Sequence, residues 1–275
     1  MKGVTDVISR DGLSGFTLYL LVWTLSVIFC LTDIAMAQEK ANNNMLLYMK
    51  FDTLNENENK EVCLQDESFY ANECRLLGEG YSLIDGIDGK ALLIDGRKNA
   101  VSLPYARQLD LKMATGFTVQ FWFRPSETAL QAGDVHRWVL FGNKVDTSPG
   151  GYVLQYRVAQ RVFVFSFASE DRFKPVVIES VALPVPLKPN EWYHFAVTGR
   201  EGKINFFLNG AGLSSKESIV GEIPPLRAGV RIGTYRIDRF DSIAPFIGAI
   251  DEFKVEAIAR SDFPEVRKVV PARKP

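Results

Sequence analysis

Alternation of apolar and polar residues with period two is the feature of this sequence that most restricts its fold. In residues 117–124 every second residue is Phe or Val, and similar alternation recurs in 162–167, 193–197 and 203–208. Residues two apart in an extended strand lie on one face, and aromatic or β-branched side chains suit a half-buried sheet. No stretch keeps a helical period over three turns. The pattern therefore predicts an all-β protein.

Turn signals separate the alternating runs. Asn209-Gly210 is a strong two-residue hairpin turn, and Gly-rich breaks occur at 85–89 and 149–151. Short strands divided by turns about every ten residues are typical of sandwiches and barrels. We therefore expect a two-sheet antiparallel β-sandwich.

The first 37 residues are organised like a secretory signal peptide. A polar start with Lys2 and Arg10 precedes an apolar run from Phe16 to Leu31, and Ala35-Met36-Ala37 is a small-x-small cleavage pattern. Because the run is shorter than the ~20 residues of a spanning helix, cleavage is favoured over a retained membrane anchor. We therefore expect an extracytoplasmic protein, secreted or periplasmic, without membrane insertion after cleavage.

Cleavage would leave a polar lead-in at 38–44, one domain at 45–258 and a polar C-terminal tail at 259–275. The removed residues carry two basic and three acidic side chains, so 30 basic and 30 acidic side chains remain. A surface without net charge has no general attraction for nucleic acid. Nucleic acid is therefore not an expected partner.

Two cysteines lie in the mature part of the chain, Cys63 and Cys74. In an oxidising compartment we expect them to form a disulfide, which would stabilise the fold by roughly 2–3 kcal/mol. A metal site is the alternative, but no other Cys or His lies nearby, since the histidines are His136 and His194. The disulfide is the favoured interpretation.

Several short elements follow one another in a characteristic order. They are the segments at 46–52, 66–72, 89–96, 116–125, 192–194, 208–210 and 248–252. In this order they resemble the laminin-G-like domains of the concanavalin A-like lectin/glucanase family over nearly the whole mature chain. The resemblance implies a jelly roll of two antiparallel sheets packed face to face. Departures are Ile94, where the family usually has Phe, and a longer first connection that contains both cysteines.

The same resemblance implies a calcium site. Members of this family often bind a structural Ca²⁺ near the first and last strands, and Asp52 and Asp251 match those positions. Alternation places Asp251 on the face of Phe253 and Val255, inside the sandwich, where a carboxylate needs a partner. The alternative is a buried carboxylate bonded to backbone amides or to an arginine such as Arg97.

Catalysis is not expected. The Glu-x-Asp-x-x-Glu device of laminarinase-type glycosidases is absent, because no glutamate has an aspartate two positions later. Trp192 and His194 could be taken for a catalytic pair, but the favoured interpretation is one face of a strand, with His194 hydrogen-bonded at its edge. No phosphate-binding Gly loop or metal-hydrolase cluster occurs.

The loop after residue 233 has the composition of a ligand-binding loop. Tyr235 and Phe240 could stack on a sugar, while Arg236 and Asp238 supply hydrogen-bonding groups; a solvated loop with internal ion pairs is the alternative. We predict a non-catalytic recognition module that binds a glycan or an envelope protein through loops or its concave sheet. The alternatives are a structural or assembly subunit of the cell envelope and, less favoured, a glycoside hydrolase.

Overall fold

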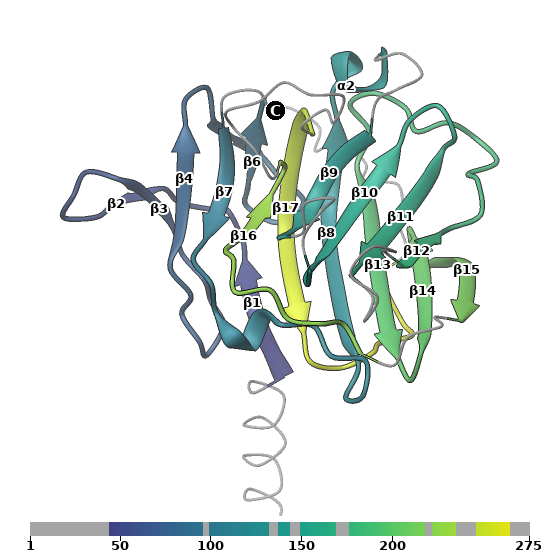
Figure 1. Cartoon of the computed structure of the whole chain (residues 1–275). Coiled ribbons are helices and arrows are strands. Elements are labelled where there is room, and N and C mark those ends of the chain that lie inside the picture. Colours follow the sequence, from purple (N-terminus) through teal and green to yellow (C-terminus); the bar gives the residue numbers. More distant parts are fainter. Residues whose placement is uncertain are drawn as a thin grey trace, which may run out of the picture. The chain divides into compact units, whose positions relative to one another are not determined.

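The structure is a computed structural model that describes residues 44–95, 99–131, 137–143, 149–168, 176–217, 222–234 and 246–264. The regular secondary structure of these residues is almost entirely β-strand, with one short 3₁₀ helix, η1 (Arg107–Leu109), and one short α-helix, α2 (Glu127–Gln131) (Figure 1). No helix in these ranges is both long enough and apolar enough to cross a membrane. The predicted signal peptide lies outside the described residues.

The first layer is an eight-stranded sheet. Its strands are β1 (Met45–Met49), β5 (Ser82–Asp85), β6 (Lys90–Ile94), β8 (Phe117–Pro125), β13 (Tyr193–Arg200), β14 (Lys203–Leu208), β15 (Ala211–Glu217) and β17 (Gly248–Glu256). The order across the sheet is β15-β14-β13-β8-β17-β6-β5, and β1 also pairs with β17. The first and last strands of the domain are therefore neighbours.

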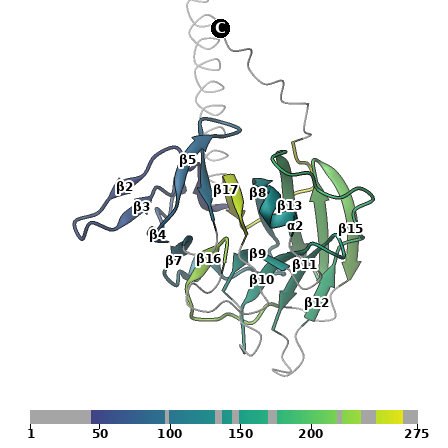
Figure 2. The same ribbon diagram turned by 90° about the horizontal axis from the view of Figure 1, so that it is seen from above.

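The second layer is a nine-stranded sheet. Its strands are β2 (Asn55–Glu56), β3 (Val62–Leu64), β4 (Cys74–Gly78), β7 (Asn99–Leu103), β9 (Arg137–Gly142), β10 (Tyr152–Arg157), β11 (Val162–Phe167), β12 (Val176–Glu179) and β16 (Val230–Ile232). The order is β12-β11-β10-β9-β16-β7-β4-β3-β2. Figure 2 shows the two layers face to face, so the predicted antiparallel β-sandwich is confirmed.

Aromatic side chains from both sheets fill the space between the layers. The ring of Phe163 on β11 lies 4.1 Å from that of Phe195 on β13, measured between centroids. Phe165 similarly contacts Phe117 at 5.5 Å. All four side chains are buried, and such pairs add about 0.5–1.5 kcal/mol beyond the burial of area. The alternating residues of the sequence therefore form the core.

An irregularity in β17 changes which residues face this core. Asp251 pairs with Trp122 of β8, and the register shifts before the next pair. Glu252, at the shift, has a φ of 48°. Because of this bulge Phe253 packs in the core, whereas Asp251 shares the opposite side of the strand with Trp122. The prediction that Asp251 lies on the face of Phe253 is therefore wrong, although Asp251 is fully buried.

The chain after β17 packs on the outer face of the eight-stranded sheet. Phe263 contacts the ring of Phe207 on β14, with 4.7 Å between centroids, and the ring of His194 on β13, at 5.8 Å. Arg260 pairs with the buried carboxylate of Glu256 at 2.6 Å. The beginning of the predicted polar tail is therefore fixed to the domain and covers part of this face.

Candidate binding site

A row of four opposed residues, three of them polar, crosses the outer face of the nine-stranded sheet. Arg75 of β4 stands opposite Ser102 of β7, Ser102 stands opposite Arg231 of β16, and Arg231 stands opposite Gly142 of β9. Opposed residues share a face of the sheet, and the alternate residues of these strands lie in the core. Because neighbouring strands are about 4.8 Å apart, the row extends for about 14 Å.

The row is the floor of an open groove with a volume of about 500 Å³, a size ordinary for ligand sites. The groove is lined by Arg75, Leu77, Ser102, Leu103, Pro104, Gly142, Asn143, Ala228, Gly229 and Arg231. A Cβ atom at Gly142 would lie 2.4 Å from the carbonyl oxygen of Tyr152. The chain therefore requires glycine at this position, and the floor stays flat beside Arg231.

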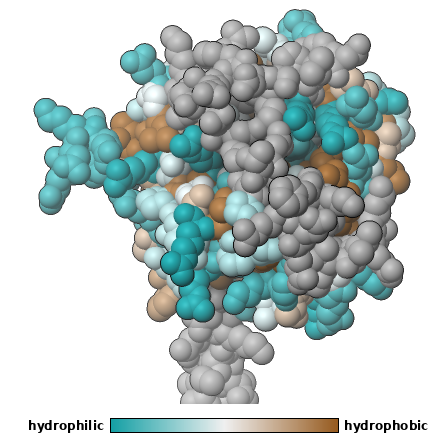
Figure 3. Space-filling model, in the orientation of Figure 1, coloured by the Kyte–Doolittle hydropathy of each residue, from teal (hydrophilic) through white to brown (hydrophobic). Residues whose placement is uncertain are grey.

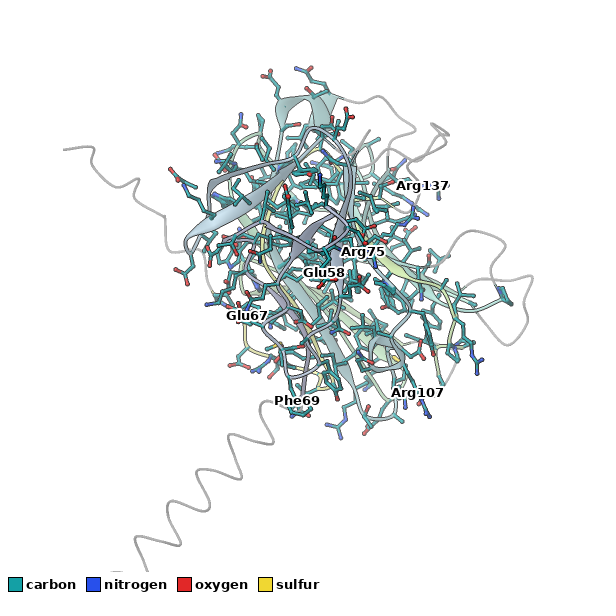
Figure 4. All side chains as sticks on the ribbon, turned by 90° about the vertical axis from the view of Figure 1, so that its left-hand side faces the viewer. Glu58, Glu67, Phe69, Arg75, Arg107 and Arg137 are labelled. Atoms are coloured by element: carbon teal, nitrogen blue, oxygen red, sulfur yellow. The ribbon has the colours of Figure 1, made fainter. Side chains whose placement is uncertain are left out.

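Carboxylates orient the guanidinium group of Arg75. Its Nη1 lies 3.0 Å from Glu61, and Glu73 accepts further hydrogen bonds from the same group. The hydrogen bonds that the guanidinium donates to Glu73, above all, raise the pKa of Arg75. Glu61 belongs to the acidic region around the β2–β3 hairpin, which projects as a hydrophilic arm (Figure 3) and includes Glu58, labelled in Figure 4. Arg75 is therefore a positioned hydrogen-bond donor whose charge is compensated.

Asn143 is fixed at the wall of the groove by backbone contacts. Its Oδ1 accepts a hydrogen bond from the amide of Tyr152 at 3.1 Å, and its Nδ2 donates to the carbonyl oxygen of Leu226 at 3.4 Å. Guanidinium and hydroxyl groups on the floor and an amide group at the wall can form hydrogen bonds with the hydroxyl groups of a ligand. The geometry thus suits an oxygen-rich, uncharged ligand.

The ligand-binding residues predicted from the sequence lie outside the described residues. They are Tyr235, Arg236, Asp238 and Phe240. The described ends of their loop are joined, because the amide of Phe246 donates to the carbonyl oxygen of Gly233 at 2.8 Å. Tyr235 follows Arg231, a residue of the groove, by four positions. The role of this loop stays a prediction.

The two predicted metal ligands, Asp52 and Asp251, converge on the turn between β5 and β6. Asp251 Oδ2 accepts hydrogen bonds from the amides of Ile87 at 2.6 Å and Asp88 at 3.4 Å. Asp52 Oδ1 accepts one from the amide of Lys90 at 2.7 Å. Together the two carboxylates hold the turn against the first and last strands of the domain.

Glycines make room for both carboxylates. A Cβ atom at Gly86 would lie 2.4 Å from Asp251 Oδ2, and one at Gly89 would lie 2.0 Å from Asp52 Oδ1. Burial raises the pKa of Asp251 to about 6, against the opposing effect of its backbone hydrogen bonds. These amides account for the burial of Asp251 without an ion. In the described part of the chain no cluster of three or more His, Cys, Asp or Glu side chains is placed to hold a metal.

The structure does not contain the predicted disulfide. Cys63 of β3 stands opposite Arg75, whereas Cys74 of β4 stands opposite Leu64. The two thiols therefore lie on opposite faces of the β3–β4 ladder: Cys74 is buried with Leu64, Cys63 is half-buried, and both are free. The two cysteines are close in the sequence, but the register of this strand pair directs their side chains to opposite faces of the sheet.

His194 is buried within an aromatic cluster. Its ring lies 5.1 Å from that of Trp122, and its Nδ1 has no hydrogen-bond partner. Burial, followed by the nearby charge of Lys254, lowers the pKa of His194 to about 4. The expectation of a hydrogen-bonded His194 at a strand edge is therefore corrected. At neutral pH its imidazole ring is uncharged, and it packs against the ring of Phe263.

Sequence reasoning missed Arg75, Ser102 and Asn143 as candidate ligand residues. Alternation indicates that Ser102 points away from the core, because Val101 and Leu103 are apolar. It does not indicate that β4, β7 and β16 are neighbours, and only that order brings Arg75, Ser102 and Arg231 into one row.

Known proteins support the architecture. The binding domain of Paraclostridial Mosquitocidal Protein 1 resembles this chain with a TM-score of 0.60 and 16% sequence identity, and the match covers 80% of this chain and 50% of that one. Domain 4 of AbnA, a GH43 extracellular arabinanase from Geobacillus stearothermophilus, solved in complex with arabinotriose, has a TM-score of 0.56 and 18% identity, with 78% of this chain and 93% of that one covered. The receptor-binding domain of botulinum neurotoxin C/D mosaic serotype has a TM-score of 0.57 and 15% identity, with 80% of this chain and 49% of that one covered. This chain thus spans about half the length of the two toxin domains. At these identities the likeness concerns the fold alone.

Sequence comparison gives the family. None of the curated protein sequences matches this chain. A laminin-G-type family model, described as the concanavalin A-like lectin/glucanases superfamily, matches residues 95–262, more than half of the chain. The match covers strands of both sheets, including β7, β9 and β16 of the groove. The chain belongs to the concanavalin A-like lectin/glucanase superfamily.

Proposed function

We propose that this protein is a non-catalytic, extracytoplasmic module that binds carbohydrate in the groove of the nine-stranded sheet. The row formed by Arg75, Ser102 and Arg231 carries the proposal, because it offers several hydrogen-bond donors on a flat floor. A related fold in an extracellular arabinanase was solved with arabinotriose bound, which supports the ligand class and an extracytoplasmic setting.

The ligand expected in this groove is a neutral oligosaccharide. Arg75 is paired with Glu61 and Glu73, so the groove does not present an uncompensated cation there to an anionic polymer. A floor of about 14 Å across four strands is longer than one sugar ring. Affinity that rests on hydrogen bonds rather than on net charge changes little with ionic strength.

The test is binding by groove variants. Arg75→Ala removes charged hydrogen-bond donors, which contribute about 1.5–3 kcal/mol each, so we expect at least a roughly tenfold weaker affinity. Ser102→Tyr, which fills the floor, should abolish binding. A glycan array identifies the ligand, and calorimetry at low and high salt measures the affinity of each variant.

The matched control is Arg200→Ala. Arg200 ends β13 in the other sheet and forms an exposed pair with Glu201, so its loss should leave affinity unchanged. Tyr235→Ala and Phe240→Ala test the predicted loop in the same assay. Wild-type affinity in both groove variants would contradict the proposal. Capture of an envelope protein, without any sugar binding, would favour the alternative of an assembly subunit.

We further propose that Asp52 and Asp251 bind a calcium ion with a structural role. Asp52 Oδ2 accepts no hydrogen bond from the described residues, so this oxygen is open to a cation. At a concentration ten times a Kd of about 10⁻⁴–10⁻³ M, calcium would stabilise the fold by about 1.4 kcal/mol. We expect melting of metal-free protein a few degrees higher with Ca²⁺ than with chelator, and no difference in Asp52→Asn. If the wild-type protein melted at the same temperature with Ca²⁺ and with chelator, the proposed calcium site would be excluded.

A further inference from the structure

Exposed aromatic rings gather at one end of the sandwich, and none of them lines the groove of the nine-stranded sheet described above (the sheet groove). In the described ranges, the large aromatic side chains with high exposure are Phe69 (75%), Tyr70 (39%) and Tyr105 (39%). Phe69 and Tyr70 meet edge to face, with 5.9 Å between centroids. Figure 4 shows Phe69 at the same lower end of the domain as Arg107, two residues after Tyr105. Core formation does not explain three exposed rings at one end.

A buried carboxylate holds the loop that presents two of these rings. Asp66 Oδ1 accepts hydrogen bonds from the amides of Tyr48 and Ser68, at 2.8 and 2.9 Å. Its Oδ2 accepts hydrogen bonds from Ser68 Oγ at 2.8 Å, from the backbone N–H of Asn72 at 2.7 Å and from the side-chain Nδ2 of Asn72 at 2.6 Å. The loop from Asp66 to Asn72 is therefore preorganised, and the exposure of its rings is not a result of a loose segment.

A second loop forms the opposite wall. Asn72 accepts a hydrogen bond from the side chain of Gln108 in η1, and this contact joins the two loops. Tyr105 donates from its hydroxyl to Asp110 at 3.0 Å. Asp110 thus points one oxygen at Tyr105 and lines the space between the loops. Both walls are held in place before any ligand arrives.

The space between these loops, the end groove, has a volume of about 480 Å³. It is lined by Leu46, Tyr70, Arg107, Gln108, Asp110, Leu111, Lys112, Thr115, Gly116, Phe117 and Ala257. The apolar floor contains Leu46, Leu111 and Phe117, which are buried. An apolar floor, one aromatic wall, and donors and acceptors at the rim are a combination that few ligand classes match.

We propose that the end groove is a second carbohydrate site, in which Tyr70 stacks on the apolar face of a sugar ring. Arg107 and Lys112 would donate hydrogen bonds to its hydroxyl groups, and Asp110 would accept them. A protein partner fits less well, because a specific interface covers about 800 Å² on each side, whereas this site is a small groove. The end groove shares no residue with the sheet groove, so this inference stands without the proposed function.

Two sites on one domain would change how it holds a polysaccharide. The second contact with the same chain is intramolecular, so the combined affinity can exceed that of either site. A short oligosaccharide that reaches only one site gains no affinity from the other site. Polymers should therefore be retained much more strongly than trisaccharides of the same sugar.

The test follows amide NMR shifts of the wild-type protein on titration with arabinotriose and with a trisaccharide of each glycan found by array. We expect shifts at Tyr70, Gln108 and Lys112. Tyr70→Ala should weaken this binding at least tenfold, whereas Tyr70→Phe, which keeps the ring, should stay within about twofold of the wild type. Melting curves of both variants establish that the fold is intact.

The two proposed sites fail independently in this experiment. With Arg75→Ala, shifts at the end groove should persist, and with Tyr70→Ala, shifts at the sheet groove should persist. Absence of shifts at Tyr70, Gln108 and Lys112 with every saccharide overturns the second site, whatever happens at Arg75. Equal binding by Tyr70→Ala and wild type, or capture of a protein at this groove in place of sugar, overturns it as well.

Discussion

Substitution of Asp251 with alanine is expected to lower the free energy of unfolding by about 3–5 kcal/mol. The carboxylate accepts hydrogen bonds from the amides of Ile87, Asp88 and Glu252, and each buried donor left without a partner costs about 1–3 kcal/mol. The turn between β5 and β6 would lose its link to the last strand. Urea unfolding of the variant and the wild type measures the difference.

Asp85→Asn is the matched control for this variant. Asp85 lies at the start of the same turn and pairs with Lys90, but its side chain is 95% exposed. Its substitution removes the same charge without uncovering buried amides, so stability should not change measurably. If Asp251→Ala were as stable as this control, the buried carboxylate would not be what holds the turn.

The pH dependence of stability provides a second signature of Asp251. Burial raises its pKa from 3.8 to about 6, so the stabilisation linked to its protonation is fully present below pH 3.8 and is lost as the pH rises through 6. Burial lowers the pKa of His194 from 6.5 to about 4, so its contribution is present above pH 6.5 and is lost as the pH falls through 4. The two effects oppose each other. Wild-type stability should therefore vary little between these values, while Asp251→Asn should lose stability on acidification.

Substitution of Asp66 with alanine is expected to have an effect of similar size, about 3–5 kcal/mol. Its two oxygens accept hydrogen bonds from Tyr48, Ser68 and Asn72, and the residue is buried. Removing the acceptor leaves these donors unsatisfied and releases the loop that carries Phe69 and Tyr70. Urea unfolding and limited proteolysis report the global and the local consequence.

Glu67→Gln separates this effect from a general loss of charge. Glu67 is the exposed neighbour of Asp66, and Figure 4 shows it on the surface. We expect its variant to unfold and to resist protease like the wild type. Asp66→Ala should also lose sugar binding at the end groove while keeping it at the sheet groove. Unchanged protease resistance in Asp66→Ala would show that the loop is held by other contacts.

The sequence predicted the layers well because alternation reports directly on burial. Phe163 and Phe165 were expected on one face, and both lie in the core. Period-two reasoning failed where the backbone departs from a regular strand. The bulge at Glu252 reverses the side on which Asp251 lies. The alternation of apolar and polar residues in β17 does not indicate this bulge.

The candidate site was harder to predict because it depends on contacts between distant segments. Cys63 and Cys74 are close in sequence, yet the register of β3 and β4 directs them to opposite faces. Conversely, Arg75 and Arg231 are far apart in sequence and become neighbours across Ser102 because β7 lies between β4 and β16. Local patterns carry no information on that strand order.

Phe263 packs against Phe207 and His194 on the outer face of the eight-stranded sheet. The described chain ends at residue 264 on the outer side of one layer, whereas the sheet groove opens on the outer side of the other. A bead, sensor chip or fusion partner attached behind Phe263 would leave the groove free. Capture through the C-terminal side is therefore the orientation in which immobilised protein should retain its full ligand capacity.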